Sequence, residues 1–197
     1  HFPDGHILRR LYYAPSTCYP AAEPHYATTL NAMRSRLALL FNQGNQFVSY
    51  TGHSGTQNWG HENYLDVNTV SGLTNGDRTP IMLPMTCLVG FYHNPAADSL
   101  SEKLLKLTTG GSVATYTPTG LQVAHGHEYL IDGFYDGVFV DGDRILGQAV
   151  LKAKINLDGG PSFYQDLHYT YMTLGDPAMQ MDFPDTVSQN FLPATFR

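Results

Sequence analysis

Two short stretches decide the fold: Gln46-Phe47-Val48-Ser49-Tyr50-Thr51-Gly52-His53-Ser54-Gly55 and Thr79-Pro80-Ile81-Met82-Leu83-Pro84-Met85-Thr86-Cys87. Each contains an apolar run typical of a buried strand, and each leads to a residue with reactive chemistry, His53 or Cys87. If the two strands lie in one parallel sheet, both side chains emerge at its carboxyl edge, where open α/β sheets place their sites. The pattern therefore predicts a cysteine–histidine dyad.

The segments around these stretches alternate between strand and helix patterns. Strands are expected at residues 6–13, 46–50, 79–87 and 112–116, and helices at residues 25–41, 67–73, 99–107, 120–140, 145–157 and 161–168. Residues 14–24 contain three prolines and are expected to form a loop. Because the helix at 25–41 joins the first two strands, these strands should be parallel with a right-handed crossover. We expect an α/β fold with a mostly parallel sheet.

Composition narrows the class of protein. The chain has 197 residues, 42% hydrophobic and 14% charged, which suits one globular domain. A net charge of −6 with only 11 Lys plus Arg argues against a partner that is a nucleic acid or an anionic membrane. No apolar stretch is long enough to predict a membrane span. The two cysteines do not suit a disulfide scaffold, and a nucleophilic Cys87 leaves Cys18 as a lone thiol.

The local setting of His53 and Cys87 suits nucleophilic chemistry. A cysteine is mostly a protonated thiol at neutral pH, so a cysteine nucleophile needs a nearby base such as a histidine. The glycines on both sides of His53 allow close approach of a substrate backbone. The alternative to a dyad is that Cys87 is an unreactive buried cysteine and His53 a surface histidine. For an arbitrary cysteine and histidine this is the commoner case.

Three motifs carry a resemblance to a known family. They are Tyr50-Thr51-Gly52-His53, Leu83-Pro84-Met85-Thr86-Cys87-Leu88-Val89-Gly90 and Tyr171-Met172-Thr173-Leu174-Gly175-Asp176-Pro177-Ala178-Met179. In this order they resemble the gingipain-like family of caspase-fold cysteine peptidases, with similarity from about Ile7 to Met181. The resemblance implies a caspase-like three-layer α/β sandwich with helices on both faces of the sheet. It also implies a secreted or cell-surface cysteine endopeptidase that hydrolyses peptide or protein substrates through an acyl-enzyme.

The resemblance assigns roles to individual residues. His53 would be the general base and Cys87 the nucleophile, and the backbone N–H groups of Cys87 and Ser54 would bind the oxyanion. The family usually has glycine where this chain has Ser54. If that position requires a positive φ, serine costs about 1 kcal/mol of strain.

A substrate pocket is expected beside the dyad. Thr51, Gly52, Met85 and Thr119 are the residues predicted to bind the substrate. The sequence places no acidic side chain there, so a preference for arginine or lysine before the scissile bond is left open, as is a neutral pocket.

Domain boundaries follow from the same resemblance. Residues 1–182 are expected to form the C-terminal part of a caspase-like peptidase domain. The family's first strand lies upstream of the segment that matches His6 to Tyr13. Because a parallel sheet without that strand would expose a buried edge, we expect an N-terminal fragment of the same precursor to supply it. Residues 183–197 show no periodicity and are expected to be a C-terminal arm or linker.

Other candidate sites have simpler readings. His125 and His127 are too close in sequence to share a helix face, so no metal site is predicted there. Gly175-Asp176-Pro177 is expected to be structural, with Asp176 capping a turn before the last strand. No cofactor is expected to be required. A group of aspartates lacks EF-hand spacing and is better explained as polar turns, and a structural calcium ion is kept only because the family resemblance implies it: Asp136, Asp141, Asp143 and Asp158.

A second function remains open from the sequence. A protein of the same fold could serve as a surface or assembly module with little or no peptidase activity, because fold does not fix function. Ser54 and the missing first strand both favour this alternative.

Overall fold

The computed structural model describes residues 6–15, 25–121, 123–182 and 189–195. The strands are β1 (His6–Leu8), β2 (Tyr12–Tyr13), β3 (Tyr26–Ala27), β4 (Phe47–Thr51), β5 (Asn58–Trp59), β6 (Leu65–Asp66), β7 (Ile81–Met85), β8 (Ala114–Pro118), β9 (Tyr171–Leu174) and β10 (Gln189–Thr195). The α-helices are α1 (Leu30–Asn42), α2 (Val67–Val70), α3 (Leu100–Leu105), α4 (Gly126–Asp136), α5 (Leu146–Asp158) and α6 (Leu167–Thr170). A π-helical turn follows α4 at Gly137–Asp141, and a 3₁₀ turn lies at Ser162–Tyr164.

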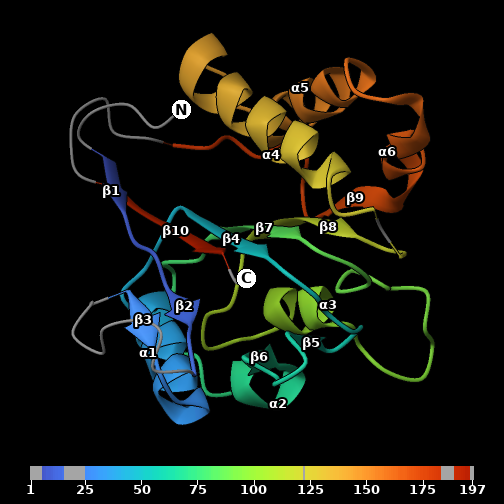
Figure 1. Ribbon diagram of the computed structural model, residues 1–197. Coiled ribbons are helices and arrows are strands. Elements are labelled where there is room, and N and C mark those ends of the chain that lie inside the picture. The colour runs from blue at the N-terminus through green and yellow to red at the C-terminus, as the bar shows by residue number, and fades with distance from the viewer. Residues whose placement is uncertain (1–5, 16–24, 122, 183–188, 196–197) are drawn as a thin grey trace.

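A six-stranded sheet forms the middle layer, in the order β1-β10-β4-β7-β8-β9 (Figure 1). All neighbouring strands are parallel except β8 and β9. Helices α1, α2 and α3 lie on one side of this sheet, and α4, α5 and α6 lie on the other (Figure 1). This arrangement confirms the expected three-layer α/β sandwich with a mostly parallel sheet.

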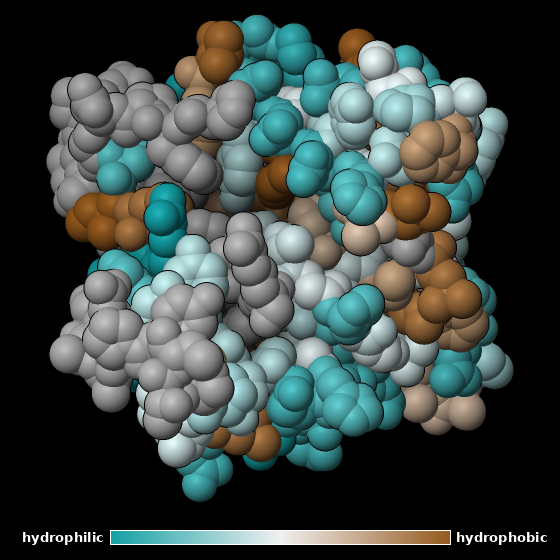
Figure 2. Space-filling view, in the orientation of Figure 1, coloured by the Kyte–Doolittle hydropathy of each residue, from teal (hydrophilic) through white to brown (hydrophobic). Residues whose placement is uncertain are grey.

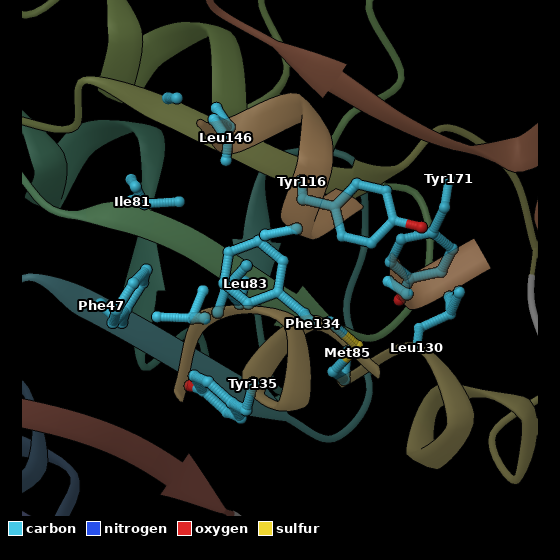
Figure 3. Close-up of a cluster of buried hydrophobic side chains, with 14 of the residues drawn as sticks. Phe47, Ile81, Leu83, Met85, Tyr116, Leu130, Phe134, Tyr135, Leu146 and Tyr171 are labelled. Atoms are coloured by element: carbon cyan, nitrogen blue, oxygen red, sulfur yellow. The ribbon is translucent and has the colours of Figure 1, made fainter. Parts of the chain in front are cut away.

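Alternating side chains of the central strands fill two separate cores. On β4, Phe47 belongs to the core under α4 and α5, whereas Val48 and Tyr50 belong to the core beside α1. Figure 3 shows Phe47 gathered with Leu83, Phe134 and other large side chains of the first core. The strands are apolar on both faces because both faces of the sheet are covered. Removing one such aromatic side chain is expected to cost about 3–5 kcal/mol.

Helix α1 begins later than the sequence predicts. Thr29 has extended backbone angles, and its hydroxyl accepts a hydrogen bond from the N–H of Ala32 at 3.2 Å. This N-cap fixes the start at Leu30 rather than at residue 25. The buried residues of the helix, Met33, Leu37 and Phe41, recur every four positions and face the sheet.

The predicted strand at residues 6–13 is two strands in two different sheets. β1 pairs with β10 in the main sheet, whereas β2 pairs with β3 in a separate two-stranded sheet. The chain leaves the main sheet between them, where Leu11 is buried in the core beside α1. Burial of this leucine on the helix side of the sheet explains why a single strand does not continue.

Two further predictions about helices need correction. The expected helix at residues 120–140 begins only at Gly126, and its last part is the π-helical turn, which ends at Gly142 in the left-handed conformation with φ 78°. The expected helix at residues 161–168 is the 3₁₀ turn followed by α6. Strand β9 follows directly, and the sequence pattern did not distinguish it because antiparallel pairing with β8 places it at the edge of the sheet.

Strand β10 occupies a place that the sequence does not predict. Residues 183–197 are expected to form an arm or linker, whereas residues 189–195 lie between β1 and β4 and pair with both. Residues 183–188 and 196–197 lie outside the described residues. The physical reason is the edge of β4: its buried backbone N–H and C=O groups need partners, and any extended segment can supply them. In this structure β10 supplies the strand expected from an upstream segment.

Figure 2 shows one face, on which hydrophilic residues predominate and hydrophobic residues form small groups. Within the described ranges, no helix is long and apolar enough to cross a bilayer.

Candidate active site

The two strands that lead to His53 and Cys87 are neighbours in the sheet. β4 and β7 are parallel, and their register pairs Thr51 with Met85. His53 and Cys87 each follow two positions after this pair, so both come directly after the carboxyl ends of adjacent strands. The structure therefore brings the two predicted dyad residues to the same edge of the sheet at matching positions.

Two hydrogen bonds fix the backbone carbonyl of His53. The Tyr50 hydroxyl and the N–H of Gly60 both donate to the carbonyl oxygen of His53, at 2.6 and 2.7 Å. The ring of Tyr50 stacks on Trp59 with 4.5 Å between centroids. Burial raises the pKa of Tyr50 above its usual range, so its hydroxyl remains a hydrogen-bond donor. The side chain of His53 is exposed above this fixed backbone.

The turn that carries Cys87 is anchored by a tyrosine from β9. The hydroxyl of Tyr171 accepts the N–H of Thr86 at 3.2 Å and donates to the carbonyl of Pro84 at 3.0 Å. Leu88, directly after Cys87, has a φ of 53°. A leucine in this region is strained, and the surrounding bonds must hold it there. Cys87 itself is half-buried.

Ser54 joins the two segments across the edge. Its hydroxyl accepts a hydrogen bond from the N–H of Cys87 at 3.2 Å, donates to the carbonyl of Cys87, and lies 2.7 Å from the Thr86 hydroxyl. The Thr86 hydroxyl in turn donates to the carbonyl of Gly52 at 2.6 Å. These contacts fix the spacing between the histidine segment and the cysteine segment.

This network changes the picture of the predicted oxyanion donors. The N–H of Cys87, one of the two, already donates to the Ser54 hydroxyl. Among described residues other than glycine, positive φ values occur at Asn63 and Leu88 and not at Ser54, so the expected strain at Ser54 does not arise. The family resemblance concerns only the backbone N–H of Ser54. The signal in the sequence was the serine directly after His53, because the hydroxyl of Ser54 can accept a hydrogen bond from a nearby backbone N–H.

A cavity of about 240 Å³ opens beside the ends of β4 and β7. It is lined by Thr51, Met85, Ala124, His125, His127, Glu128 and Ile131. Two of the predicted substrate-binding residues, Thr51 and Met85, are therefore at this cavity. Gly52 and Thr119 are not among its lining residues, and Thr119 is buried with its hydroxyl donating to the carbonyl of Thr170 at 2.9 Å.

A second cavity, of about 300 Å³, is lined by His53 itself and the residues that follow it. Its lining residues are His53, Ser54, Gly55, Asn58, Gly60 and His61. His61 thus lines a cleft next to the dyad, whereas Trp59 is fully buried beneath it. The predicted base His53 is therefore at a cavity, whereas Cys87 is not among the lining residues of either one.

His127 is the least expected residue of the first cavity. It is only 5% exposed, and its ring contacts the ring of Tyr171 with 5.6 Å between centroids. Burial lowers the pKa of His127 to about 4, so the imidazole is neutral at neutral pH. Its Nε2 is buried and has no hydrogen-bond partner. The sequence favours a solvated helix-start residue over a metal ligand at His127, and this expectation is wrong because the imidazole is buried.

Acidic residues are not gathered into a metal centre in the described part of the chain. Within those ranges no group of three or more His, Cys, Asp or Glu is arranged to hold an ion. Asp141 pairs with Lys152 at 2.5 Å, and Asp158 contacts His168 at 3.0 Å. Structural calcium stays a prediction. Asp176 accepts the N–H of Ala178 at 2.8 Å and so caps the turn after β9.

Comparison with known proteins points to one family. The sequence profile of peptidase family C25 matches residues 1–182. A crystal structure of the Arg-specific cysteine proteinase gingipain R is similar with a TM-score of 0.65 and 20% identity, covering 75% of this chain and 36% of that chain. A complex of the pro- and mature domains of RgpB from Porphyromonas gingivalis gives a TM-score of 0.69 and 17% identity, covering 90% and 48%.

A third structure, described only as a protease, gives a TM-score of 0.65 and 15% identity, covering 91% of this chain and 49% of that chain. The chain therefore spans half or less of the length of these solved structures. No curated protein matches the sequence.

Proposed function

The chain belongs to peptidase family C25, and from this premise we propose that it carries the catalytic dyad of a cysteine endopeptidase. Cys87 is the nucleophile and His53 the general base. The observation that carries the proposal is the register of β4 and β7, which sets His53 and Cys87 at matching positions after paired residues at one sheet edge. One cavity is lined by Thr51 and Met85 at the ends of these strands and another by His53 and Ser54, and both are open to a peptide substrate.

The reaction uses two transfers at the scissile carbonyl. His53 takes the proton from the Cys87 thiol, and the thiolate sulfur bonds to the carbonyl carbon to give a tetrahedral oxyanion. As the C–N bond breaks, the protonated imidazole gives its proton to the leaving amine, and a thioester remains on Cys87. Water then attacks the thioester with His53 as the base, which releases the carboxylic acid and restores the thiol.

The oxyanion needs two fixed donors. The backbone N–H groups of Cys87 and Ser54 are the proposed pair. For the first of these to serve, the Ser54 hydroxyl must leave its present position, where it accepts the Cys87 N–H at 3.2 Å. A donor in such a site contributes about 10²–10³ in kcat, so the position of this hydroxyl matters for turnover.

Labelling of the thiol tests the dyad. The full natural polypeptide is treated with iodoacetamide and, separately, assayed for cleavage of a denatured protein substrate under reducing conditions. We expect Cys87 to be labelled faster than a free thiol, cleavage to vanish in Cys87→Ala, and both readouts to fall at least about 100-fold in His53→Ala. The matched control is Cys18→Ala, which should keep cleavage. Slow labelling of Cys87 together with absent cleavage would contradict the proposal.

One observation favours the alternative, a surface or assembly module of the same fold. The Ser54 hydroxyl fills the donor site at Cys87, an arrangement that a protein without turnover could keep. The same assay separates the two functions, because an assembly module would show no cleavage in the wild-type protein while remaining folded.

We also propose that an upstream segment of the same precursor pairs with β4 in the full-length protein. The family match ends at residue 182, before β10, and the similar solved structures are about twice the length of this chain. One of them is a complex of pro- and mature domains. On this proposal, β10 occupies the position beside β4 in this structure, and the upstream strand occupies it in the full-length protein. Secretion or display at the cell surface, and processing of the precursor, are proposed on the same resemblance to gingipains.

Removal of residues 183–197 from the full natural polypeptide tests the exchange of strands. If an upstream strand pairs with β4, the melting temperature should change by less than about 2 °C, since little native contact is lost. A cysteine pair at Ile7 and Asn190, which are partners in the β1–β10 register, should then fail to cross-link. A large loss of stability and efficient cross-linking would instead assign the place to β10.

A further inference from the structure

The segment after His53 folds back on itself as a hairpin. The N–H of Gly60 donates to the carbonyl of His53 at 2.7 Å, and the N–H of Gly55 donates to the carbonyl of Asn58 at 3.1 Å. An antiparallel bridge lies between these two bonds. Asn58, the first residue of β5, is therefore held close to the proposed general base.

The side-chain amide of Asn58 has an end that can still bind a donor. Its Nδ2 donates to the carbonyl of Gly60 at 2.7 Å. Because a carbonyl oxygen only accepts hydrogen bonds, the nitrogen of the amide must face Gly60, and Oδ1 must point away from it. Oδ1 lies over Gly55, where an added Cβ would come within 2.6 Å of it. In the described structure Oδ1 accepts no hydrogen bond.

Asn58 and His53 line the same cavity, of about 300 Å³. The side chain of His53 is exposed, and its imidazole has no hydrogen-bond partner among the described residues. The lining residues of the cavity include no Asp or Glu, and the Ser54 hydroxyl is already bonded to Cys87. The side-chain acceptors left for the imidazole in this cavity are therefore the amide oxygen of Asn58 and the ring of His61.

The amide of Asn58 has a rigid support. β5 pairs with β6, so hydrogen bonds reach the backbone of Asn58 from both sides of the strand. The turn after Gly60 is held by α1, because the guanidinium of Arg34 donates to the carbonyls of Glu62 and Asn63 at 2.9 Å each. A partner that is fixed in advance can orient a base without being ordered during the reaction.

A histidine that acts as a base needs its ring held in one tautomer. In a neutral imidazole one nitrogen carries the proton and the other accepts. When the N–H donates to a fixed oxygen, the second nitrogen is left to take the proton of the thiol. We propose that Oδ1 of Asn58 accepts the imidazole N–H of His53 and so orients the ring toward Cys87. This role rests on the proposed function, because Asn58 is a positioning residue that acts only through His53, and no proton passes to it.

Two substitutions of similar size separate this role from a structural one. Asn58→Leu and Asn58→Asp both remove the bond to the Gly60 carbonyl, but only Asn58→Asp keeps an oxygen that can accept the imidazole N–H. Both are made in the full natural polypeptide and assayed with one fluorogenic peptide. We expect Asn58→Leu to lower kcat about 10–100-fold, part of what a positioned base contributes, and to change KM less than about twofold. Asn58→Asp should retain at least about ten times the kcat of Asn58→Leu.

Melting temperatures that agree within about 2 °C show that the two variants are equally folded. Asn68→Leu, at an exposed position of α2, is the matched control and should leave kcat unchanged. An unchanged kcat in Asn58→Leu, or equal losses in Asn58→Leu and Asn58→Asp, would overturn this inference alone. So would a loss in His61→Phe as large as that in Asn58→Leu, because the ring would then pair with His61. If the wild-type protein cleaves nothing and Cys87 does not react with iodoacetamide, the proposed function fails and this role with it.

Discussion

The Ser54 hydroxyl is bonded to both backbone groups of Cys87, accepting its N–H at 3.2 Å and donating to its carbonyl. The two residues follow different strands, so the contact ties the histidine segment to the cysteine segment. It also keeps a proposed oxyanion donor occupied while no substrate is present. If the Cys87 N–H is the proposed oxyanion donor, a substrate must displace this hydroxyl before its carbonyl is polarised there.

Removal of that hydroxyl should raise turnover. Ser54→Gly removes the hydroxyl that accepts the Cys87 N–H, and we predict an increase in kcat of about tenfold, a fraction of what a full oxyanion donor contributes. The measurement is steady-state kinetics on one peptide. Ser71→Gly, at the end of α2, is the matched control and should change nothing. A fall in kcat for Ser54→Gly would mean that the hydroxyl supports the site instead of blocking it.

The Tyr171 hydroxyl should stabilise the turn at Cys87. Tyr171→Phe leaves the buried N–H of Thr86 without its partner at 3.2 Å and removes the donor to the Pro84 carbonyl. We predict a loss of about 1–3 kcal/mol in the free energy of unfolding, measured with urea. Tyr169→Phe is the comparison, because Tyr169 is 83% exposed and should cost less than about 0.5 kcal/mol. Equal effects of the two substitutions would count against this role.

Stability should fall in mild acid because of His127. The unfolded chain binds a proton on this histidine at an ordinary pKa near 6.5, whereas the folded chain binds it only near a pKa of about 4. Between these values the unfolded state holds more protons. The free energy of unfolding is therefore unaffected by His127 above pH 6.5 and falls as the pH is lowered toward 4. The loss should approach about 3 kcal/mol.

Urea unfolding at pH 7 and pH 4.5 measures this slope. His127→Phe should flatten the difference between the two pH values, whereas His93→Phe, at an exposed site, should retain it. An unchanged slope in His127→Phe would show that other groups cause the acid sensitivity.

Asn75 should be among the polar side chains that matter most for stability. It is 1% exposed, and its amide binds the carbonyls of Arg78 and Gly111 at 3.0 and 2.9 Å, while its oxygen accepts the N–H of Gly111 at 2.8 Å. These bonds link the loops that precede β7 and β8. Asn75→Ala should lower the free energy of unfolding by about 3 kcal/mol in urea experiments, since it strands several buried groups. Asn68→Ala, at an exposed position of α2, should have a negligible effect.

The strands that carry the candidate site were predictable because their own side chains define them. β4 and β7 are apolar on both faces, and each is followed by His53 or Cys87 within a recognisable motif. Helices α1 and α5 follow from periodicity, although the start of α1 depends on the Thr29 cap. These features are local, and local sequence encodes them.

Other features depend on what lies nearby in space. The pairing of β10 follows from the open backbone edge of β4, which no side-chain pattern of residues 189–195 reports. The place of Thr119 against Thr170 depends on a contact between β8 and the chain before β9. The bond from the Ser54 hydroxyl to Cys87 depends on the distance between two loops. Sequence reasoning could name these residues but not orient their side chains.

The cavity at the ends of β4 and β7 has buried and exposed lining residues, and this contrast has an evolutionary consequence. Changes at Ala124, His125 or Glu128 alter exposed positions and leave the packing of α4 intact, so natural variation can accumulate there at little energetic cost. A change at Met85 or His127 disturbs buried packing and lowers the stability of the folded protein, so it is selected against whatever its effect on substrate choice. Among relatives of this protein, substitutions should therefore be frequent at the exposed residues of the cavity and rare at Met85 and His127.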